Sequence, residues 1–432
     1  LNTEKTEILT DDAIGFLVTG GLIVNSVKDG ADTYTGVETS ISAATLKGID
    51  AVDFEIGGDL RFNKAPGDHK INWITATSTA NNPDDLLADL DVSDDITLQI
   101  LNGHGSLDIG PGNLVATVSD VTFTMAEMDV ATGNPLISDG TIEGANVISL
   151  DIGTASLFAG VGGSLNEDRD DILTTDAVGL LASASFKLAS VTDPTTDKNY
   201  SGLEATDISA DILGLPGDTF DVSLTNGSVA YNKGLAGEKI NWTIATGIAN
   251  DPDSLLDDLN VADDLDFRIF GTALLTVGNF IENQSITIGI EKGQDNFVLS
   301  NGTVSSSITD ADYLKFYGAI DDPLLVGHGD TGLQLSALKV GMISVSYSGQ
   351  KYTAFKASGS AALLGTAPIL ELSGSAALVS NKSDDPSNKV LDFINTSSNV
   401  TDDAAANIII DNYDGDPSTN VVLNIDGDKG EL

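Results

Sequence analysis

Segments in which apolar and polar residues alternate make up much of this chain. The clearest lie at residues 51–63, 148–160, 218–232, 341–349 and 352–365. Successive side chains of a β-strand point to opposite faces, so alternation at period two predicts strands with one apolar face. The pattern therefore predicts an all-β fold.

Asparagine–glycine pairs interrupt or bound several of these segments. They stand at Asn102-Gly103, Asn226-Gly227 and Asn301-Gly302. Both residue types accept a positive φ at little cost, so the pairs predict tight hairpins between neighbouring strands. A series of such hairpins would give an antiparallel meander.

A helical signal occurs once in each of two related segments. Asn82-Pro83-Asp84-Asp85 and Asp251-Pro252-Asp253 combine a capping side chain, a first-turn proline and acidic residues near the positive end of a helix. A short helix is predicted from each of these points. Its leucines should face the sheet: Leu86, Leu87, Leu90, Leu255, Leu256 and Leu259.

The two related segments belong to a long internal duplication. ILTDDAIGFL at 8–17 recurs as ILTTDAVGLL at 172–181, and residues 75–100 recur as residues 243–269. Shorter matches lie between these two in the same order: Tyr34 corresponds to Tyr200, Asn63 to Asn232 and Trp73 to Trp242. A self-similar period of this length indicates tandem units.

A third, weaker copy continues the spacing through Tyr352 and Asn381, although Asp392 stands where the other copies have Trp. The predicted division is residues 1–165, 166–324 and 325–432, all of them all-β. The predicted architecture is a tandem array of β-sandwich or solenoid-like repeat modules stacked end to end, with one short helix per full repeat. Because the start lacks Met and signal-peptide features, the chain is interpreted as a processed product or an excerpt.

The two tryptophans occupy equivalent positions in the duplication. A recurrent Trp in a β-rich unit is more often a core residue than part of a binding platform. Trp73 and Trp242 are therefore predicted to be buried.

Composition narrows the possible partners. Asp and Glu number 65 against 20 Lys and Arg, giving a formal net charge of -45. Nucleic acid is bound by neutralising phosphates with Lys and Arg, so that class of partner is excluded. The absence of Cys excludes disulfides and thiolate sites, and no run of about 18 apolar residues predicts a membrane span. At 41% hydrophobic residues, the chain can still bury a core.

Aspartate-rich loops predict calcium (Ca2+) sites, because calcium takes six to eight oxygens from short side chains and carbonyls. The tail candidates are Asp411, Asp414, Asp416, Asn424, Asp426 and Asp428. A second set comprises Asp89, Asp91, Asp94 and Asp95, echoed by Asp257, Asp258, Asp263 and Asp264. Neither set completes an EF-hand loop. A solvated acidic surface and adaptation to high salt are the alternatives.

Catalytic groupings are sparse in this sequence. His69, His104 and His328 lie far apart, and none stands at metal-ligand spacing from another. Glu238 replaces His69 in the second copy, which argues against a shared triad or metal site. The chain is therefore predicted not to be an enzyme.

The run YTAFKASGSAALLGTAPILELSGSAALVSNK at 352–382, with the Asn-Lys and Lys-Ile-Asn-Trp echoes, resembles the tandem-repeat all-β regions of very large bacterial cell-surface and secreted proteins, adhesin-like in character. The resemblance implies export, extended arrays, calcium-dependent rigidity and roles in adhesion or extracellular matrix. The nonapeptides of the RTX calcium roll are absent, so that calcium geometry is not carried over.

The sequence thus predicts a structural or adhesive repeat segment of an exported bacterial surface or matrix protein, located outside the cell or at its surface. Its expected partners are neighbouring repeats, copies of itself or a cell-surface glycan. The alternatives are a self-assembling extracellular filament or surface-layer subunit and, as the weaker one, a calcium-dependent polysaccharide-active enzyme.

Overall fold

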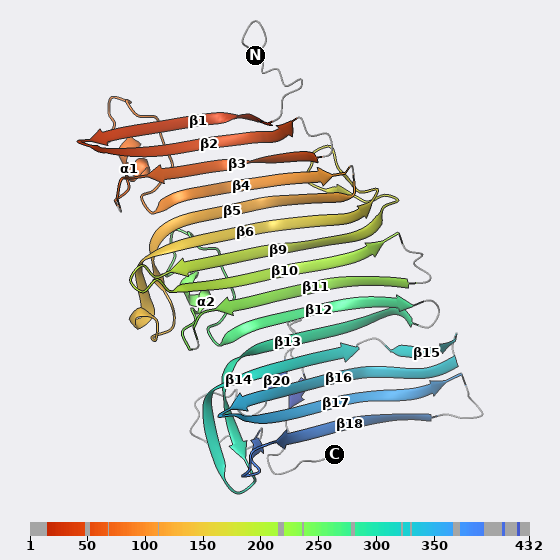
Figure 1. Ribbon diagram of the computed structural model, residues 1–432. Helices are drawn as coiled ribbons and strands as arrows, with labels where there is room; N and C mark the ends of the chain where they lie inside the picture. Colours follow the sequence, from red (N-terminus) through yellow and green to blue (C-terminus); the bar gives the residue numbers. More distant parts are fainter. Residues whose placement is uncertain are drawn as a thin grey trace. The chain divides into compact units, whose positions relative to one another are not determined.

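The structure, a computed structural model, is dominated by long antiparallel strands (Figure 1). It describes residues 15–47, 52–67, 69–110, 112–214, 220–235, 237–277, 281–320, 323–328, 331–365, 372–392, 408–410 and 421–423. The predicted all-β class is confirmed. Within these residues, none of the helices has the length and apolar character needed to cross a membrane.

The chain divides into two compact units. The first comprises Leu1–Ala205 with Lys233–Ala262, and the second comprises Thr206–Asn232 with Asp263–Leu432. The predicted division into residues 1–165, 166–324 and 325–432 follows sequence similarity and stays a prediction.

The long strands of the first unit pair in chain order. β1 pairs with β2, β2 with β3, β3 with β4, β4 with β5, β5 with β6 and β6 with β9. The strand bounds are β1 (Gly15–Asp29), β2 (Asp32–Lys47), β3 (Val52–Lys64), β4 (Ile96–Ile109), β5 (Leu114–Ala131), β6 (Thr141–Val161), β7 (Ser164–Leu165), β8 (Ile172–Leu173) and β9 (Val178–Thr192). The strand β10 (Asn199–Leu213) begins in this unit and ends in the second. The helical elements are α1 (Trp73–Thr77), η1 (Ser138–Gly140) and α2 (Trp242–Ala245).

The second unit has a similar meander. β11 pairs with β12, β12 with β13, β13 with β14, β14 with β16, β16 with β17 and β17 with β18, while β15 lies beside β16 and β19 beside β13. The bounds are β11 (Phe220–Lys233), β12 (Leu265–Val277), β13 (Ile281–Ser300), β14 (Ser305–Ile320), β15 (Leu324–His328), β16 (Thr331–Tyr347), β17 (Gln350–Leu364), β18 (Leu372–Ser383), β19 (Val390–Leu391), β20 (Ile408–Ile410) and β21 (Val421–Leu423).

The predicted stack of sandwich or solenoid-like modules is wrong. In the first unit, the last long strand of the first sequence copy, β6, pairs directly with the first long strand of the second copy, β9. In the second unit, β14 pairs with β16 in the same way. A strand left at a module boundary would expose unpaired N–H and C=O groups, and this pairing satisfies them. The copies therefore share continuous sheets.

Two of the three predicted hairpin turns lie inside strands. Asn102 and Asn226 have φ values of 51° and 52° and occupy β-bulges, where the register with the neighbouring strand shifts. Only Asn301-Gly302 connects two strands, β13 and β14. A left-handed residue can insert an extra position into a strand as readily as it can close a turn. The bulges bend the long strands.

The predicted helices lie about ten residues too late in the sequence. α1 and α2 begin at Trp73 and Trp242, and each is capped by the preceding asparagine. Asn82 instead accepts hydrogen bonds from the backbone N–H groups of Leu86 and Leu87, at 2.9 and 3.3 Å, and closes a turn. The capping signal was real, but the backbone it caps is a turn rather than a helix. Both tryptophans are fully buried, as predicted.

Candidate functional site: an apolar sheet face

One face of the second unit's sheet carries apolar side chains from strand to strand. The register places Ile288 opposite Gly318, Gly318 opposite Val340, Val340 opposite Ala357, and Ala357 opposite Leu378. Residues directly opposite each other in antiparallel strands project to the same face. These five residues therefore form a single row across β13, β14, β16, β17 and β18.

A second row lies two residues along on the same face. Here Ile290 is opposite Phe316, Phe316 is opposite Met342, and Met342 is opposite Phe355. Side chains two apart in a strand share a face, so both rows belong to one surface. We call the surface formed by these nine residues the apolar face.

The apolar face is partly open to solvent, whereas the other side of the same strands is packed. Ile288 is 46% exposed, and Leu378 is exposed to a similar degree. On the other side, Tyr317, Ile343 and Ala354 are buried in a cluster that includes residues of β19 and β21. The packed core of this unit therefore lies on one side of the sheet and leaves the apolar face outside it.

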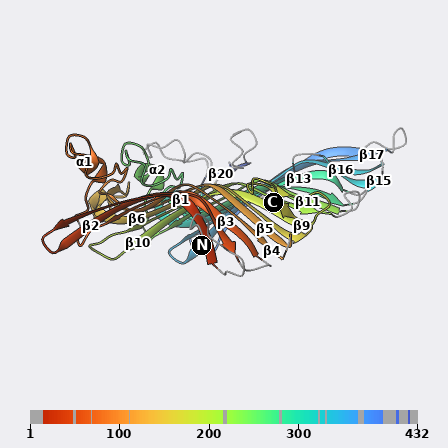
Figure 2. The same cartoon turned by 90° about the horizontal axis from the view of Figure 1, so that it is seen from above.

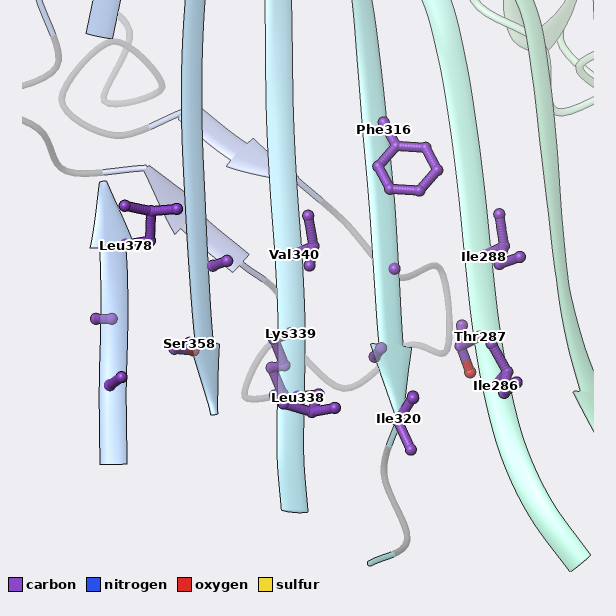
Figure 3. A pocket seen from close by; sticks show the side chains of 15 residues that line it. Ile286, Thr287, Ile288, Phe316, Ile320, Leu338, Lys339, Val340, Ser358 and Leu378 are labelled. Carbon is purple, nitrogen blue, oxygen red and sulfur yellow. The ribbon is translucent and has the colours of Figure 1, made fainter. Parts of the chain in front are cut away.

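An open groove of about 690 Å³ runs over the apolar face (Figure 3). The small residues Gly318 and Ala357 form part of its lining, and they alternate along the row with larger ones such as Ile288 and Val340. A hollow forms because the short side chains rise less far above the sheet than the longer side chains on either side of them. A second groove of about 520 Å³ shares Leu338 with the first and continues along β16 and β17 past Leu335 and Leu363.

The first unit has the same division between its two faces. On one face, a row runs through Val37, Phe62, Leu98, Met125 and Ile148 on β2 to β6. Along the chain these residues alternate with polar ones, so the opposite face is polar. Its corresponding row comprises Glu38, Arg61, Gln99, Thr124 and Ser149.

The helix-bearing loops cover the polar face of the first unit. Figure 2 shows α1 and α2 on the same side of its strands. Trp73 of α1 packs against Gly36, which lies on the same face as Glu38. Arg61 on this face donates to Gln99 Oε1 at 3.3 Å and pairs with Asp91 of the loop after α1. The polar side chains therefore anchor loops, and the apolar row lies on the side away from them.

The loop after α2 is anchored in the same way. Ser149 Oγ donates to Asp257 Oδ2 at 2.8 Å and accepts from the Asp257 N–H at 3.1 Å. Burial raises the pKa of Asp257, and the nearby Asp151 acts in the same direction while Lys187 opposes it. These contacts place a predicted metal ligand, Asp257, in a structural role.

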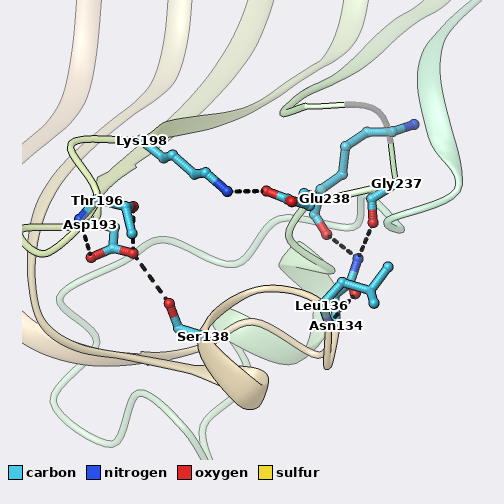
Figure 4. A network of polar contacts seen from close by, with 9 residues as sticks. Asn134, Leu136, Ser138, Asp193, Thr196, Lys198, Gly237 and Glu238 are labelled. Carbon is cyan, nitrogen blue, oxygen red and sulfur yellow. Dashed lines mark hydrogen bonds and ion pairs between the residues drawn. The ribbon is translucent and has the colours of Figure 1, made fainter.

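A further polar network joins the loops of the first unit (Figure 4). Asn134 Nδ2 donates to the backbone carbonyls of Gly237 and Lys239, both at 3.1 Å. Lys198 forms an ion pair with Glu238, the residue that replaces His69 in the second copy. These hydrogen bonds and this ion pair hold together loops that are far apart in the sequence.

Those predicted metal ligands that lie among the described residues are not brought together around a common point. Asp411, Asp414, Asp416, Asn424, Asp426 and Asp428 lie outside the described residues. Across the part of the chain that the structure describes, no group of three or more His, Asp or Glu side chains is arranged to hold a metal ion. Calcium binding at these positions stays a prediction.

Individual members of the second acidic set have identifiable roles. Asp91 pairs with Arg61, and Asp94 Oδ1 accepts from Asn72 Nδ2 at 2.8 Å. Burial raises the pKa of Asp95, and the charges of Asp94 and Asp253 add to this effect. Asp95 and Asp253 come from different sequence copies, so the first unit brings like charges of the two copies near each other.

The comparisons with known proteins identify no family. No family matches the chain, and no curated protein matches it. Among solved structures, it is similar to OpdK of Pseudomonas aeruginosa with vanillate, at 11% identity over 87% of this chain and 94% of that one, with a TM-score of 0.20. It is also similar to OccK8 (OprE) of the same organism, at 9% identity over 88% and 96% of the two chains, with a TM-score of 0.19.

These findings correct the family expected from the sequence. The two structures are outer-membrane porins rather than adhesin-like repeat regions, and no family of such repeats matches. The predicted adhesive or structural repeat role is therefore wrong, together with its filament or surface-layer alternative. With TM-scores near 0.2, the porin structures assign no role to this chain. The extracellular or cell-surface location stays a prediction.

Reasoning from the sequence missed the apolar face, although its signal was present. The alternating segments predict strands with one apolar face. Nothing in a period-two pattern states which apolar rows are covered by other parts of the chain. Only the register and the position of the loops show that the covered face of the first unit is the polar one.

Proposed function

We propose that this chain is a lipid-binding protein without catalytic activity of its own, whose apolar face holds the acyl chains of single lipid molecules. The observation that carries the proposal is the apolar face of the second unit, which runs across five strands and lies outside the packed core. Exposed contiguous apolar surface is costly in water and marks a binding site.

The grooves fit acyl chains in both size and chemistry. Their volumes of about 690 and 520 Å³ fall within the usual range for ligand sites. Aliphatic side chains such as Leu338 and Val340 form their walls (Figure 3). An extended hydrocarbon chain gains by burial against such walls without requiring hydrogen bonds.

Two properties of the chain indicate which kind of lipid it binds and whether the lipid is a single molecule or part of a bilayer. The net charge of -45 repels anionic headgroups, which favours neutral or zwitterionic lipids. The grooves have the volumes of ligand sites and lie on one face of a sheet whose other face is packed. Single lipid molecules in the grooves therefore fit better than insertion of the sheet into a bilayer.

Binding of a fluorescent long-chain acyl probe to the full chain tests this proposal. Val340→Lys places a charge in the groove and should weaken probe binding at least tenfold. Val304→Lys is the matched control, because Val304 is exposed in the connection between β13 and β14. Circular dichroism would confirm that both variants keep their sheet content.

The lipid source is tested in a second arm with phosphatidylcholine vesicles. Uptake of monomeric probe that is lost in Val340→Lys supports the proposal. Equal probe binding by the two lysine variants would overturn it. Binding to vesicles with no uptake of monomeric probe would overturn the choice of single lipid molecules.

A further inference from the structure

The two grooves of the second unit meet at Leu338 and Ala376, which line both of them. The first groove crosses β13, β14, β16, β17 and β18, and Ala376 lies on the last of these strands. The second groove starts from the same two residues and follows β16 and β17 to Leu333 and Leu363. The grooves therefore run in different directions from one shared end.

A β-bulge positions Leu338 at this junction. The register between β16 and β17 shifts between Ser336 and Lys339, and Ala337 in this interval has a φ of 50°. A bulge re-aims the side chains beside it. A Cβ atom added at Gly359 would clash with Cδ2 of Leu338, so this leucine side chain lies directly on the backbone of β17. Leu338 therefore separates the two grooves where they meet.

Each groove has about the length of one acyl chain. The first runs from β13 across to β18, about 19 Å at roughly 4.8 Å between neighbouring strands. The second follows β17 from Gly359 to Leu363, about 13 Å at roughly 3.3 Å per residue. An acyl chain spans about half of the roughly 30 Å hydrocarbon thickness of a bilayer, or about 15 Å. Neither groove is long enough for two chains end to end.

We infer that the two grooves hold the two acyl chains of one diacyl lipid, whose chains diverge on either side of Leu338. This inference rests on the proposed lipid-binding function and names its ligand class. The chains of a diacyl lipid are joined at one end, as the two grooves are. Two single-chain lipids would each lose translational freedom on binding, whereas a diacyl lipid loses it once. The paired grooves therefore favour the diacyl ligand.

Displacement of the fluorescent acyl probe from the full chain tests this inference. The competitors are a diacyl phosphatidylcholine below its critical micelle concentration and a lysophosphatidylcholine with the same acyl chain. The diacyl lipid should bind at least tenfold more tightly to the wild type, because it buries hydrocarbon in both grooves. Native mass spectrometry should find one diacyl molecule per chain.

A charge in the second groove separates the two chain sites. Leu335→Lys and Ala361→Lys introduce it from β16 and β17, at positions that lie opposite each other in register. Each variant should weaken diacyl binding at least tenfold. Binding of lysophosphatidylcholine should stay within about twofold, because its single chain occupies the larger first groove, and this retained binding shows that the variants fold. The control Val304→Lys should change neither affinity.

Three outcomes would overturn the inference. The first is an equal loss of both lipids in Leu335→Lys and Ala361→Lys, because the second groove would then belong to a single-chain site. The others are unchanged diacyl binding in both variants and equal affinity of the wild type for the two lipids. A chain that takes up the acyl probe with any of these results still binds single-chain lipids, whereas a chain that takes up no probe overturns the proposed function and this inference together.

Discussion

A Cβ atom at Gly36 would lie 2.6 Å from Nε1 of Trp73, closer than any real side chain tolerates. Gly202 and Trp242 repeat this relationship at 2.5 Å in the second copy. The indole ring in each case lies directly on the backbone of a strand, and glycine provides the space. The short helices α1 and α2 are therefore held to the sheet through a glycine–tryptophan contact.

Gly36→Ala should destabilise the first unit by about 1–3 kcal/mol, because the new methyl group forces Trp73 or Leu90 to move in a packed site. Urea unfolding followed by tryptophan fluorescence measures this loss. Gly21→Ala is the control, since a Cβ at Gly21 would have no neighbour within 4 Å. Equal midpoints for the two variants would show that the contact is looser than the structure indicates.

Asn63→Ala should also destabilise the first unit, by about 2–4 kcal/mol, because it leaves buried polar groups without partners. Asn63 Oδ1 accepts from Trp73 Nε1 at 3.0 Å, and its Nδ2 donates to the carbonyls of Ile71 and Ser93. The matched control is Asn81→Ala, whose exposed amide donates to Thr75 O. Thermal unfolding should separate the two variants, and a control as unstable as Asn63→Ala would contradict this argument.

The sequence predicted the burial of the two tryptophans better than the backbone conformation of the segments around them. It correctly placed Trp73 and Trp242 in the interior, since the duplication singles them out. It placed the helices at Asn82 and Asp251, where capping signals are strong, whereas the structure has turns there. A capping side chain accepts backbone N–H groups in either conformation, so the local pattern does not distinguish a turn from a first helical turn.

The bulges and the apolar face depend on contacts between strands. Asn102-Gly103 has the chemistry of a hairpin turn, but the strands on either side of it continue to pair with the same neighbours. Whether a positive φ closes a turn or inserts a bulge depends on register, which a single segment does not contain. In the same way, the alternation around Val340 predicts a face but not what covers it.

Added monovalent salt should stabilise the protein. The charge of -45 produces self-repulsion in the compact state, and raising the ionic strength from about 0.01 to 0.1 M shortens the Debye length from roughly 30 to 10 Å. The midpoint of thermal unfolding should rise by about 5 °C or more over this range. Sodium chloride and choline chloride should act alike, since screening does not depend on the cation. A midpoint that falls with either salt would contradict the argument.

Asp251→Asn should stabilise the protein at neutral pH and flatten its pH dependence. Burial raises the pKa of Asp251, and the charges of Asp253 and Asp258 act in the same direction, although the N–H groups of Leu255 and Leu256 oppose them. The folded state therefore keeps this proton at pH values where the unfolded chain has lost it. Wild-type stability should fall as the pH rises from the ordinary value of 3.8 through the raised pKa, and stay lower above it.

The chain provides its own precedent for this substitution. Asn82 occupies the corresponding position in the first copy and accepts the same pair of backbone N–H groups through Oδ1. Asparagine carries no charge, so Asp251→Asn should keep these bonds and avoid the cost of a buried carboxylate. Urea unfolding between pH 3 and 8 measures the difference. The variant should gain on the wild type as the pH rises and lose that gain in acid, and a difference independent of pH would show that Asp251 titrates alike in the folded and unfolded chains.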